Sequence, residues 1–166
     1  MRAAPAPRGR VRALVQRVSR AEVTVENRVT GAIAGGLLVL LGVTHGDGPG
    51  EAAWLAHKIA RLRIFADEAG KMNRDVSQAG GRALVVPQFT LYGDARRGLR
   101  PDFTAAAAPE HAEPLFDAFC SRLAAEGVGI ERGVFRAHMS VTLVNDGPVT
   151  LWIETPAGAG AGAETA

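Results

Sequence analysis

Two short polar segments, each directly after an apolar run, are the places where this sequence is best suited to bind a ligand. Residues 87–94 read PQFTLYGD and follow the run ALVV, and residues 145–150 read NDGPVT and follow the run VTLV. Each combines glycine and proline with polar side chains at a strand exit, where backbone amide and carbonyl groups can be left free to hold a ligand. The sequence has no Gly-x-Ser-x-Gly elbow and no Walker-type phosphate loop.

In the first segment, the polar residues Gln88 and Thr90 alternate with the apolar residues Phe89 and Leu91. If the preceding strand continues through the segment, its pleat places the polar pair on one face and the apolar pair on the other. One interpretation is the edge of a half-buried strand, and the other is a ligand site. Thr90 as an activated nucleophile would need a general base, and the sequence offers none nearby.

In the second segment, Gly147 and Pro148 stand between two strand-like runs. Asp146 followed by Gly147 has the chemistry of a hairpin turn, which is the simplest interpretation. Pro148 is more than a turn requires, because its ring makes the backbone rigid and the peptide bond before it can be cis. The alternative is a rigid element whose carbonyl points in a fixed direction.

The other reactive side chains are isolated from one another. The single cysteine, Cys120, lies in an apolar helical pattern and is expected to be a buried structural thiol. Four histidines occur singly, with no second ligand at metal-binding spacing, so we expect no metal site and no cofactor. His45 and His138 border strands, where they could line a pocket or form ordinary polar surface. His57 and His111 are expected on helix surfaces.

The pattern of apolar residues predicts two helices and many strands. The continuous apolar run at 37–43 is too short for a helix and predicts a central strand buried on both faces. Apolar residues at helical spacing predict the helices, and β-branched runs predict most of the other strands. The helices are expected at about 50–64 and in a segment that ends before Gly127, and the strands at 11–18, 21–26, 29–34, 37–43, 82–86, 130–135, 140–144 and 149–154.

Two helices can cover only one side of so many strands. The predicted fold class is therefore α/β: a three-layer α/β/β single domain with a mixed sheet and two helices. This arrangement leaves strand surface uncovered. A second subunit would close that surface, so we expect a homodimer.

The domain is expected to span residues 11–155. Residues 1–10 are rich in Ala, Pro and Arg, and residues 156–166 are mostly Ala and Gly, so both are predicted to be disordered tails. No segment has the apolar length of a signal peptide or of a membrane span. We therefore expect a soluble cytoplasmic protein with no membrane partner.

The isoelectric point of about 9.2 suggests nucleic-acid binding, but the tails account for the excess positive charge. The whole chain has a net charge of +2; residues 1–10 carry three arginines and residues 156–166 carry one glutamate, so residues 11–155 have a net charge of zero. Any contact with RNA must then come from a local patch rather than from bulk charge.

The two polar segments resemble the paired signatures of the D-aminoacyl-tRNA deacylase family, Ser-Gln-Phe-Thr-Leu and Asn-x-Gly-Pro-x-Thr. Both occur in the expected order and at compatible spacing. The resemblance extends from about residue 12 to residue 154. It includes the start of the chain at 12–18, the buried run at 36–43, and the segments 71–73 and 100–103.

The resemblance implies hydrolysis of the ester that links a D-amino acid, or glycine, to the terminal ribose of tRNA, a proofreading step in translation quality control. It also implies a metal-free homodimer with the three-layer fold. Gly147 and Pro148 are then expected to form a cis dipeptide that projects into the pocket of the other subunit. Their carbonyls would accept hydrogen bonds from the substrate's α-amino group, and an L side chain would meet backbone where a D side chain points to open space.

The remaining roles also follow from the resemblance. The backbone amides around Phe89 and Thr90 would stabilise the oxyanion, and Gln88 would orient the substrate. Arg17 would hold the Gly147-Pro148 loop, and Asn145 belongs with the substrate-binding residues. The arginines at 96, 97 and 100 would either contact phosphate or simply lie in a solvated loop.

One residue departs from the family pattern: Pro87 stands where the family has serine. With proline at this position, the segment resembles the motif of a related animal tRNA deacylase, which reads Pro-Gln-Ala-Thr-Leu. That enzyme tolerates some L-alanyl substrates. Pro87 belongs with the expected substrate-binding residues and brings neither a hydroxyl nor an N–H to the pocket. The alternative functions are therefore a relaxed deacylase of L-alanyl-tRNA and glycyl-tRNA errors, and an RNA-binding module that binds tRNA without catalysis.

Overall fold

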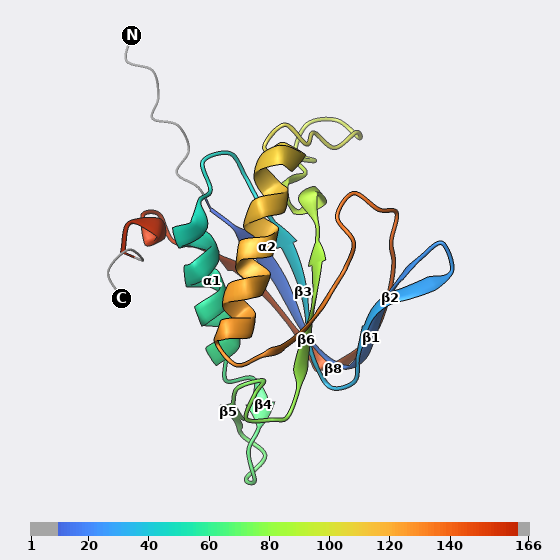
Figure 1. The fold of residues 1–166 in the computed structure, drawn as a ribbon, viewed down its shortest axis with the longest axis vertical. Coiled ribbons are helices and arrows are strands. Elements are labelled where there is room, and N and C mark those ends of the chain that lie inside the picture. The colour runs from blue at the N-terminus through green and yellow to red at the C-terminus, as the bar shows by residue number, and fades with distance from the viewer. Residues whose placement is uncertain (1–9, 163–166) are drawn as a thin grey trace.

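A computed structural model describes residues 10–162 of the chain (Figure 1). Of the tail expected at 1–10, only Arg10 falls within this range. None of the described helices is both long enough and apolar enough to cross a membrane. The elements are β1 (Arg12–Val25), β2 (Arg28–Ile33), β3 (Gly36–Gly42), α1 (Pro49–Arg61), β4 (Phe65–Ala66), β5 (Met72–Arg74), β6 (Arg82–Pro87), the 3-10 helix η1 (Phe89–Tyr92), α2 (Pro109–Ala125), β7 (Gly129–Arg132), β8 (Ser140–Glu154) and the 3-10 helix η2 (Ala159–Gly162).

The main sheet is organised around β1. Strands β2 and β3 follow one another along one edge of β1, both antiparallel to it, and β8 runs antiparallel along the other edge. Beyond β3, the sheet continues with β6 and β7, which are parallel to their neighbours. The sheet also curls, so that β2 comes close to β7. The evidence is that a Cβ added at Gly31 of β2 would lie 2.7 Å from the carbonyl oxygen of Arg132 in β7. The result is a mixed sheet that nearly closes into a barrel.

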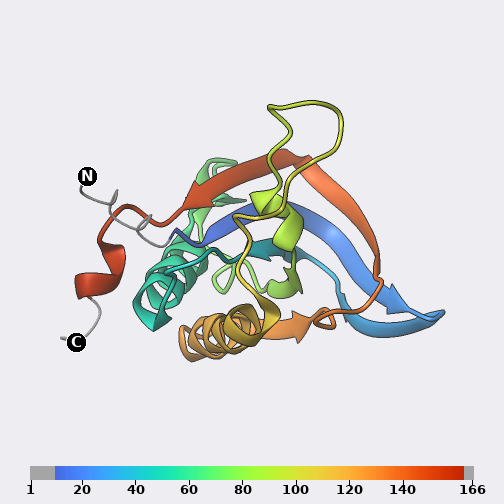
Figure 2. The same ribbon diagram turned by 90° about the horizontal axis from the view of Figure 1, so that it is seen from above.

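Strands β3 and β6 separate two cores. On β3, Leu37 and Val39 point toward the helices, whereas Leu38 points into the curled half of the sheet with Leu84 and Val86 of β6. The apolar run at 37–43 is therefore buried on both faces, as the sequence predicted. Helices α1 and α2 lie side by side over one face (Figure 1), and β1, β2 and β8 curve over the other (Figure 2). This arrangement confirms the predicted α/β domain with a mixed sheet and two helices.

Several predicted boundaries were wrong. The runs 11–18 and 21–26 form the single strand β1, and the runs 140–144 and 149–154 form the single strand β8, because these two strands pair with each other over most of their lengths. The short strands β4 and β5 lie in a region that the sequence left unassigned. Within the tail expected at 156–166, η2 packs against α1; residues 163–166 lie outside the described range.

The loop between β3 and α1 contacts the segment around residue 106 and the start of α2. Thr44 forms an antiparallel bridge with Ala106. The side chain of Asp47 is only 2% exposed; its Oδ2 accepts the N–H of Thr44 at 2.7 Å, and its Oδ1 has no hydrogen-bond partner within the described chain. The backbone carbonyl of Asp47 accepts a hydrogen bond from Nε2 of His111 in α2 at 2.7 Å. Burial raises the pKa of Asp47 to about 6, although the hydrogen bond from Thr44 opposes the rise.

We predict that Asp47→Asn stabilises the chain at alkaline pH. Because the pKa of Asp47 in the folded state lies above its ordinary value of 3.8, the wild type loses stability as the pH rises from about 4 to about 6. The variant keeps an oxygen for the N–H of Thr44 and removes the buried charge. Its free energy of unfolding in urea should exceed that of the wild type by about 2 kcal/mol at pH 8, and by little at pH 4.

Asp67→Asn is the control with the opposite sign. Asp67 is a partly exposed residue whose pKa is lowered, first by the hydrogen bond with the backbone of Lys71. Removing this carboxylate should therefore reduce stability at pH 8. An equal difference between wild type and Asp47→Asn at both pH values would contradict the account of the buried charge.

Candidate functional site

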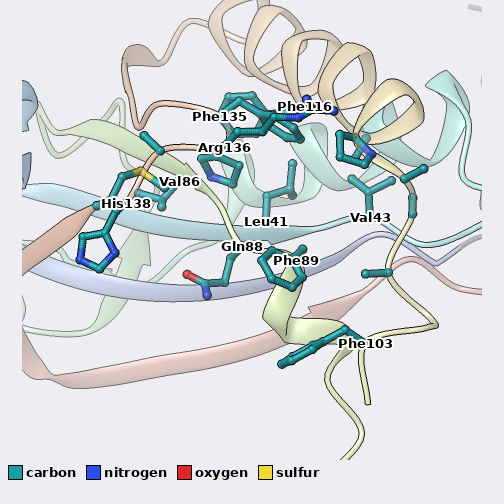
Figure 3. A pocket seen from close by; sticks show the side chains of 18 of the residues that line it. Leu41, Val43, Val86, Gln88, Phe89, Phe103, Phe116, Phe135, Arg136 and His138 are labelled. Atoms are coloured by element: carbon teal, nitrogen blue, oxygen red, sulfur yellow. The ribbon is translucent and has the colours of Figure 1, made fainter. Parts of the chain in front are cut away.

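An apolar pocket of about 760 Å³ lies between the carboxyl end of β6 and the start of α2. Figure 3 shows Leu41, Val43 and Val86 in the middle of the pocket, with Phe116 and Phe135 on the side of α2. On the opposite side lie Gln88, Phe89 and Phe103. The pocket is thus a cavity with aromatic side chains on two sides and few polar groups.

The first polar segment forms a rim of this pocket, but not as a strand. Strand β6 ends at Pro87, which pairs with Leu41, and Phe89–Tyr92 form the 3-10 helix η1. The predicted alternation of faces from Gln88 to Leu91 is therefore wrong, because the chain turns directly after the strand. The turn is closed by the N–H of Leu91, which donates to the carbonyl of Gln88 at 3.2 Å.

This turn leaves two backbone amides free. The N–H groups of Phe89 and Thr90 open η1 and have no acceptor among residues 10–162. The side-chain amide of Gln88 donates to Oγ1 of Thr90. Two adjacent amide donors thus lie beside an apolar pocket, which is the arrangement that stabilises a developing negative charge.

Arg12, which sequence reasoning missed, holds η1 in place. Its Nη1 donates to the carbonyl oxygen of Leu91 at 3.0 Å, and its Nε donates to the carboxylate of Glu154 at 2.7 Å. The guanidinium also stacks over the ring of Tyr92, 4.1 Å from the ring centroid. Local sequence carries no signal for these contacts, because the partners are 79 and 142 residues away along the chain.

The second polar segment is a bulge in β8 rather than a hairpin turn. Asn145 pairs with Val18 and Thr150 pairs with Gln16, so residues 146–149 together lie opposite the single residue Arg17. Of the two interpretations, the hairpin turn is wrong, because the strands on both sides of the segment pair with β1. The bond between Gly147 and Pro148 is cis, and both residues are exposed.

Two side chains fix the bulge. Oδ1 of Asn145 accepts the N–H of Val149 at 2.8 Å, and its Nδ2 donates to Oγ1 of Thr150 at 2.9 Å. Arg17 donates from Nε to the carbonyl of Asp146 at 2.9 Å and from Nη1 to the carbonyl of Ile64 at 2.6 Å. Gly147 is required at its position, because its φ is +140° and a Cβ there would lie 2.8 Å from the side chain of Val149.

The structure divides the predicted site residues into two groups. Pro87, Gln88 and Phe89 line the pocket, and Thr90 follows them in η1. The other predicted residues do not line the pocket of their own chain: they gather at the β1–β8 bulge and are Arg17, Asn145, Gly147 and Pro148. Within the described range, no group of three or more His, Cys, Asp or Glu side chains is arranged to hold a metal ion.

Comparison with known structures finds the same fold elsewhere. A chain titled "c-Myc DNA Unwinding Element Binding Protein" superposes with a TM-score of 0.82 at 40% identity, covering 88% of this chain and 99% of that one. A "probable eukaryotic D-amino acid tRNA deacylase" superposes with a TM-score of 0.74 at 18% identity, covering 87% of this chain and 99% of that one. At this low identity, the second match shows the fold alone.

Comparison of sequences identifies the family. The chain is 58% identical to the D-aminoacyl-tRNA deacylase of Thermomicrobium roseum, covering 87% of this chain and 94% of that protein. It is 59% identical to the protein of the same name from Anaeromyxobacter dehalogenans, with 87% and 97% covered. The model of the family described as D-Tyr-tRNA(Tyr) deacylase matches residues 14–154. The chain therefore belongs to the D-Tyr-tRNA(Tyr) deacylase family, a family of hydrolases.

Proposed function

We propose that the chain hydrolyses the ester bond of D-aminoacyl-tRNA and glycyl-tRNA in the cytoplasm, releasing the amino acid and free tRNA as a proofreading step. Family membership supports the substrate class. The observation that carries the reaction type is the pair of free amides of Phe89 and Thr90 at the rim of the apolar pocket. An aminoacyl ester is already activated, so placing a water molecule and stabilising the oxyanion suffice.

In the proposed reaction, the terminal adenosine of tRNA enters the pocket between aromatic side chains, which stack on bases. A water oxygen bonds to the ester carbonyl carbon, and the carbonyl oxygen takes up negative charge that the amides of Phe89 and Thr90 stabilise. The carbonyl then re-forms as the bond to the ribose oxygen breaks, and the ribose oxygen takes the proton that the attacking water gives up. The neighbouring ribose hydroxyl assists, and Gln88 orients the substrate.

The proposed chiral filter is the Gly147-Pro148 bulge of a second subunit. In one chain this bulge is exposed and lies apart from the pocket, while Arg17 and Asn145 hold it in a fixed conformation. Its carbonyls are proposed to accept hydrogen bonds from the substrate's α-amino group, so that an L side chain meets backbone. An exposed face of β8, on which Trp152 is 50% and Val144 is 41% exposed, provides apolar surface for the dimer.

Relaxed selectivity is a second candidate, because Pro87 lines the pocket. A proline there provides neither the hydroxyl of the family's serine nor an N–H. The pocket therefore has two polar groups fewer, the hydroxyl and the N–H, with which to hold the substrate in a single orientation. Hydrolysis of L-alanyl-tRNA and glycyl-tRNA is the corresponding activity.

We predict that the chain removes D-tyrosine from tRNA faster than L-tyrosine. Pro87→Ser should further raise the ratio of D-alanyl to L-alanyl hydrolysis about fivefold, since one hydrogen bond to a substrate contributes about 1 kcal/mol. The measurement is the release of radiolabelled amino acid from the D-tyrosyl, L-tyrosyl, D-alanyl, L-alanyl and glycyl esters by each protein. Loss of the D-tyrosyl ester no faster than in buffer would refute the function, and tRNA binding with no hydrolysis of any ester would favour the non-catalytic module.

A second prediction isolates the backbone amide. Phe89→Pro removes the N–H at the first position of η1, where proline is tolerated, whereas Phe89→Ala removes only the ring. Phe89→Pro should lower kcat for D-tyrosyl-tRNA by about 10²–10³, as loss of an oxyanion donor does. Phe89→Ala should act mainly on KM. Equal kcat values for the two variants would show that the amide stabilises no charge.

Mixed dimers test the contribution of the second subunit. Gly147→Ala damages the bulge, and Phe89→Pro damages the pocket rim, so each homodimer should be nearly inactive. When the two variants are mixed at random in equal amounts, half of the dimers are mixed. Each mixed dimer has one site with an intact bulge and an intact pocket, so about one site in four is intact. Recovery of about a quarter of wild-type activity is expected, and no recovery despite verified mixed dimers would mean that bulge and pocket act within one chain.

A further inference from the structure

The loop from Asp94 to Asp102, here named the arginine loop, lies in the chain between Phe89 and Phe103, which both line the pocket. It leaves η1 through Gly93 and returns to Phe103, whose ring packs edge-on against Phe89 with centroids 5.3 Å apart. Two backbone hydrogen bonds between Asp94 and Asp102, of 2.7 and 2.9 Å, close its base. Figure 2 shows the loop in yellow-green, projecting from the body of the molecule. Its base is therefore fixed relative to the proposed reaction centre.

One arginine of the loop serves the loop itself. Arg96 donates from Nε and Nη2 to the two carboxylate oxygens of Asp94, at 2.9 and 2.6 Å, and its backbone N–H donates to the same carboxylate. These hydrogen bonds lower the pKa of Asp94 to about 2. Asp94 and Arg96 thus neutralise each other's charge and stabilise the conformation of the first residues of the loop.

The other two arginines of the loop, Arg97 and Arg100, are exposed and have no hydrogen-bond or ion-pair partner among the described residues. Between them lies Leu99, whose side chain is fully exposed. Most other described arginines bind a carboxylate or a carbonyl group; Arg20 and Arg28, on β1 and β2, are the other exceptions within residues 10–162. Since residues 11–155 have no net charge, the loop concentrates unpaired positive charge beside the pocket.

We infer that Arg97 and Arg100 bind backbone phosphates of the tRNA acceptor strand next to its 3′ end. The inference rests on the proposed function, because a chain whose last nucleotide enters the pocket must pass this rim. Guanidinium groups hold phosphate oxygens through paired hydrogen bonds, and such contacts position a nucleic acid without reading its sequence. Leu99 then packs against a ribose between the two contacts. The loop increases affinity for the whole tRNA and leaves the chemistry at the ester unchanged.

The test compares Arg97→Ala/Arg100→Ala with a matched control, Arg20→Ala/Arg28→Ala, which removes the same charge from β1 and β2. Steady-state kinetics on D-tyrosyl-tRNA should show a KM about tenfold higher or more for the loop variant, with kcat within about twofold of the wild type. The slope of log KM against log salt concentration should fall by about 2 for the loop variant alone. Hydrolysis of 3′-O-(D-tyrosyl)adenosine, which lacks phosphate, should be the same for all three proteins.

The outcomes separate the two proposals. Equal KM values and salt slopes for the loop variant and the control would overturn the inference while leaving the deacylase activity intact. If the wild type hydrolyses no aminoacyl-tRNA, the proposed function fails, and filter binding of uncharged tRNA to the same proteins then decides the role of the loop. Weaker binding of the loop variant to anionic phosphatidylserine vesicles, with unchanged tRNA binding, would assign the loop to a membrane surface and also overturn the inference. Unchanged thermal unfolding confirms that the variants are folded.

Discussion

The antiparallel ladder between β1 and β8 is the interaction on which the rest of the structure depends. It runs from Arg12 with Glu154 to Thr24 with Ser140, and it accommodates four residues of β8 opposite Arg17. Because the ladder is paired on both sides of this point, the extra residues can only project from the sheet. The Gly147-Pro148 bulge is therefore fixed by the longest pairing among the described strands rather than by a flexible turn.

The same strand also positions the other half of the site. On its opposite edge, β1 pairs with β3, which in turn pairs with β6, and β6 ends at Pro87 directly before η1. Arg12 of β1 binds the carbonyl of Leu91, so one strand supplies an anchor for the turn and, through Arg17, an anchor for the bulge. Cores on both faces of β3 and β6 hold these strands rigid. Backbone amides can stabilise charge without reorganising only when they are held in this way.

Charge in this molecule is largely neutralised locally. Asp94 binds Arg96 within one loop, and Glu154 binds Arg12 at the edge of the sheet. Such pairs add little stability at an exposed surface, but they direct the remaining charge. A neutral body with unpaired guanidinium groups near one pocket would attract a polyanion to that place rather than to the whole surface.

The sequence by itself determined the helices, the doubly buried strand at 37–43 and the family signatures, because apolar periodicity and local motifs are properties of short segments. It did not give the backbone conformation at 88–91 or the strand pairing at 145–150, although the resemblance implied the cis bond between Gly147 and Pro148. In the first segment, alternation of polar and apolar residues continued into a 3-10 turn. In the second, a turn-like Asp-Gly pair lay inside a strand whose pairing with β1 is visible only across more than 120 residues of chain. Only the tertiary structure placed Arg12 on η1 and showed that the second segment lies within one long strand, because both facts depend on which distant strands become neighbours.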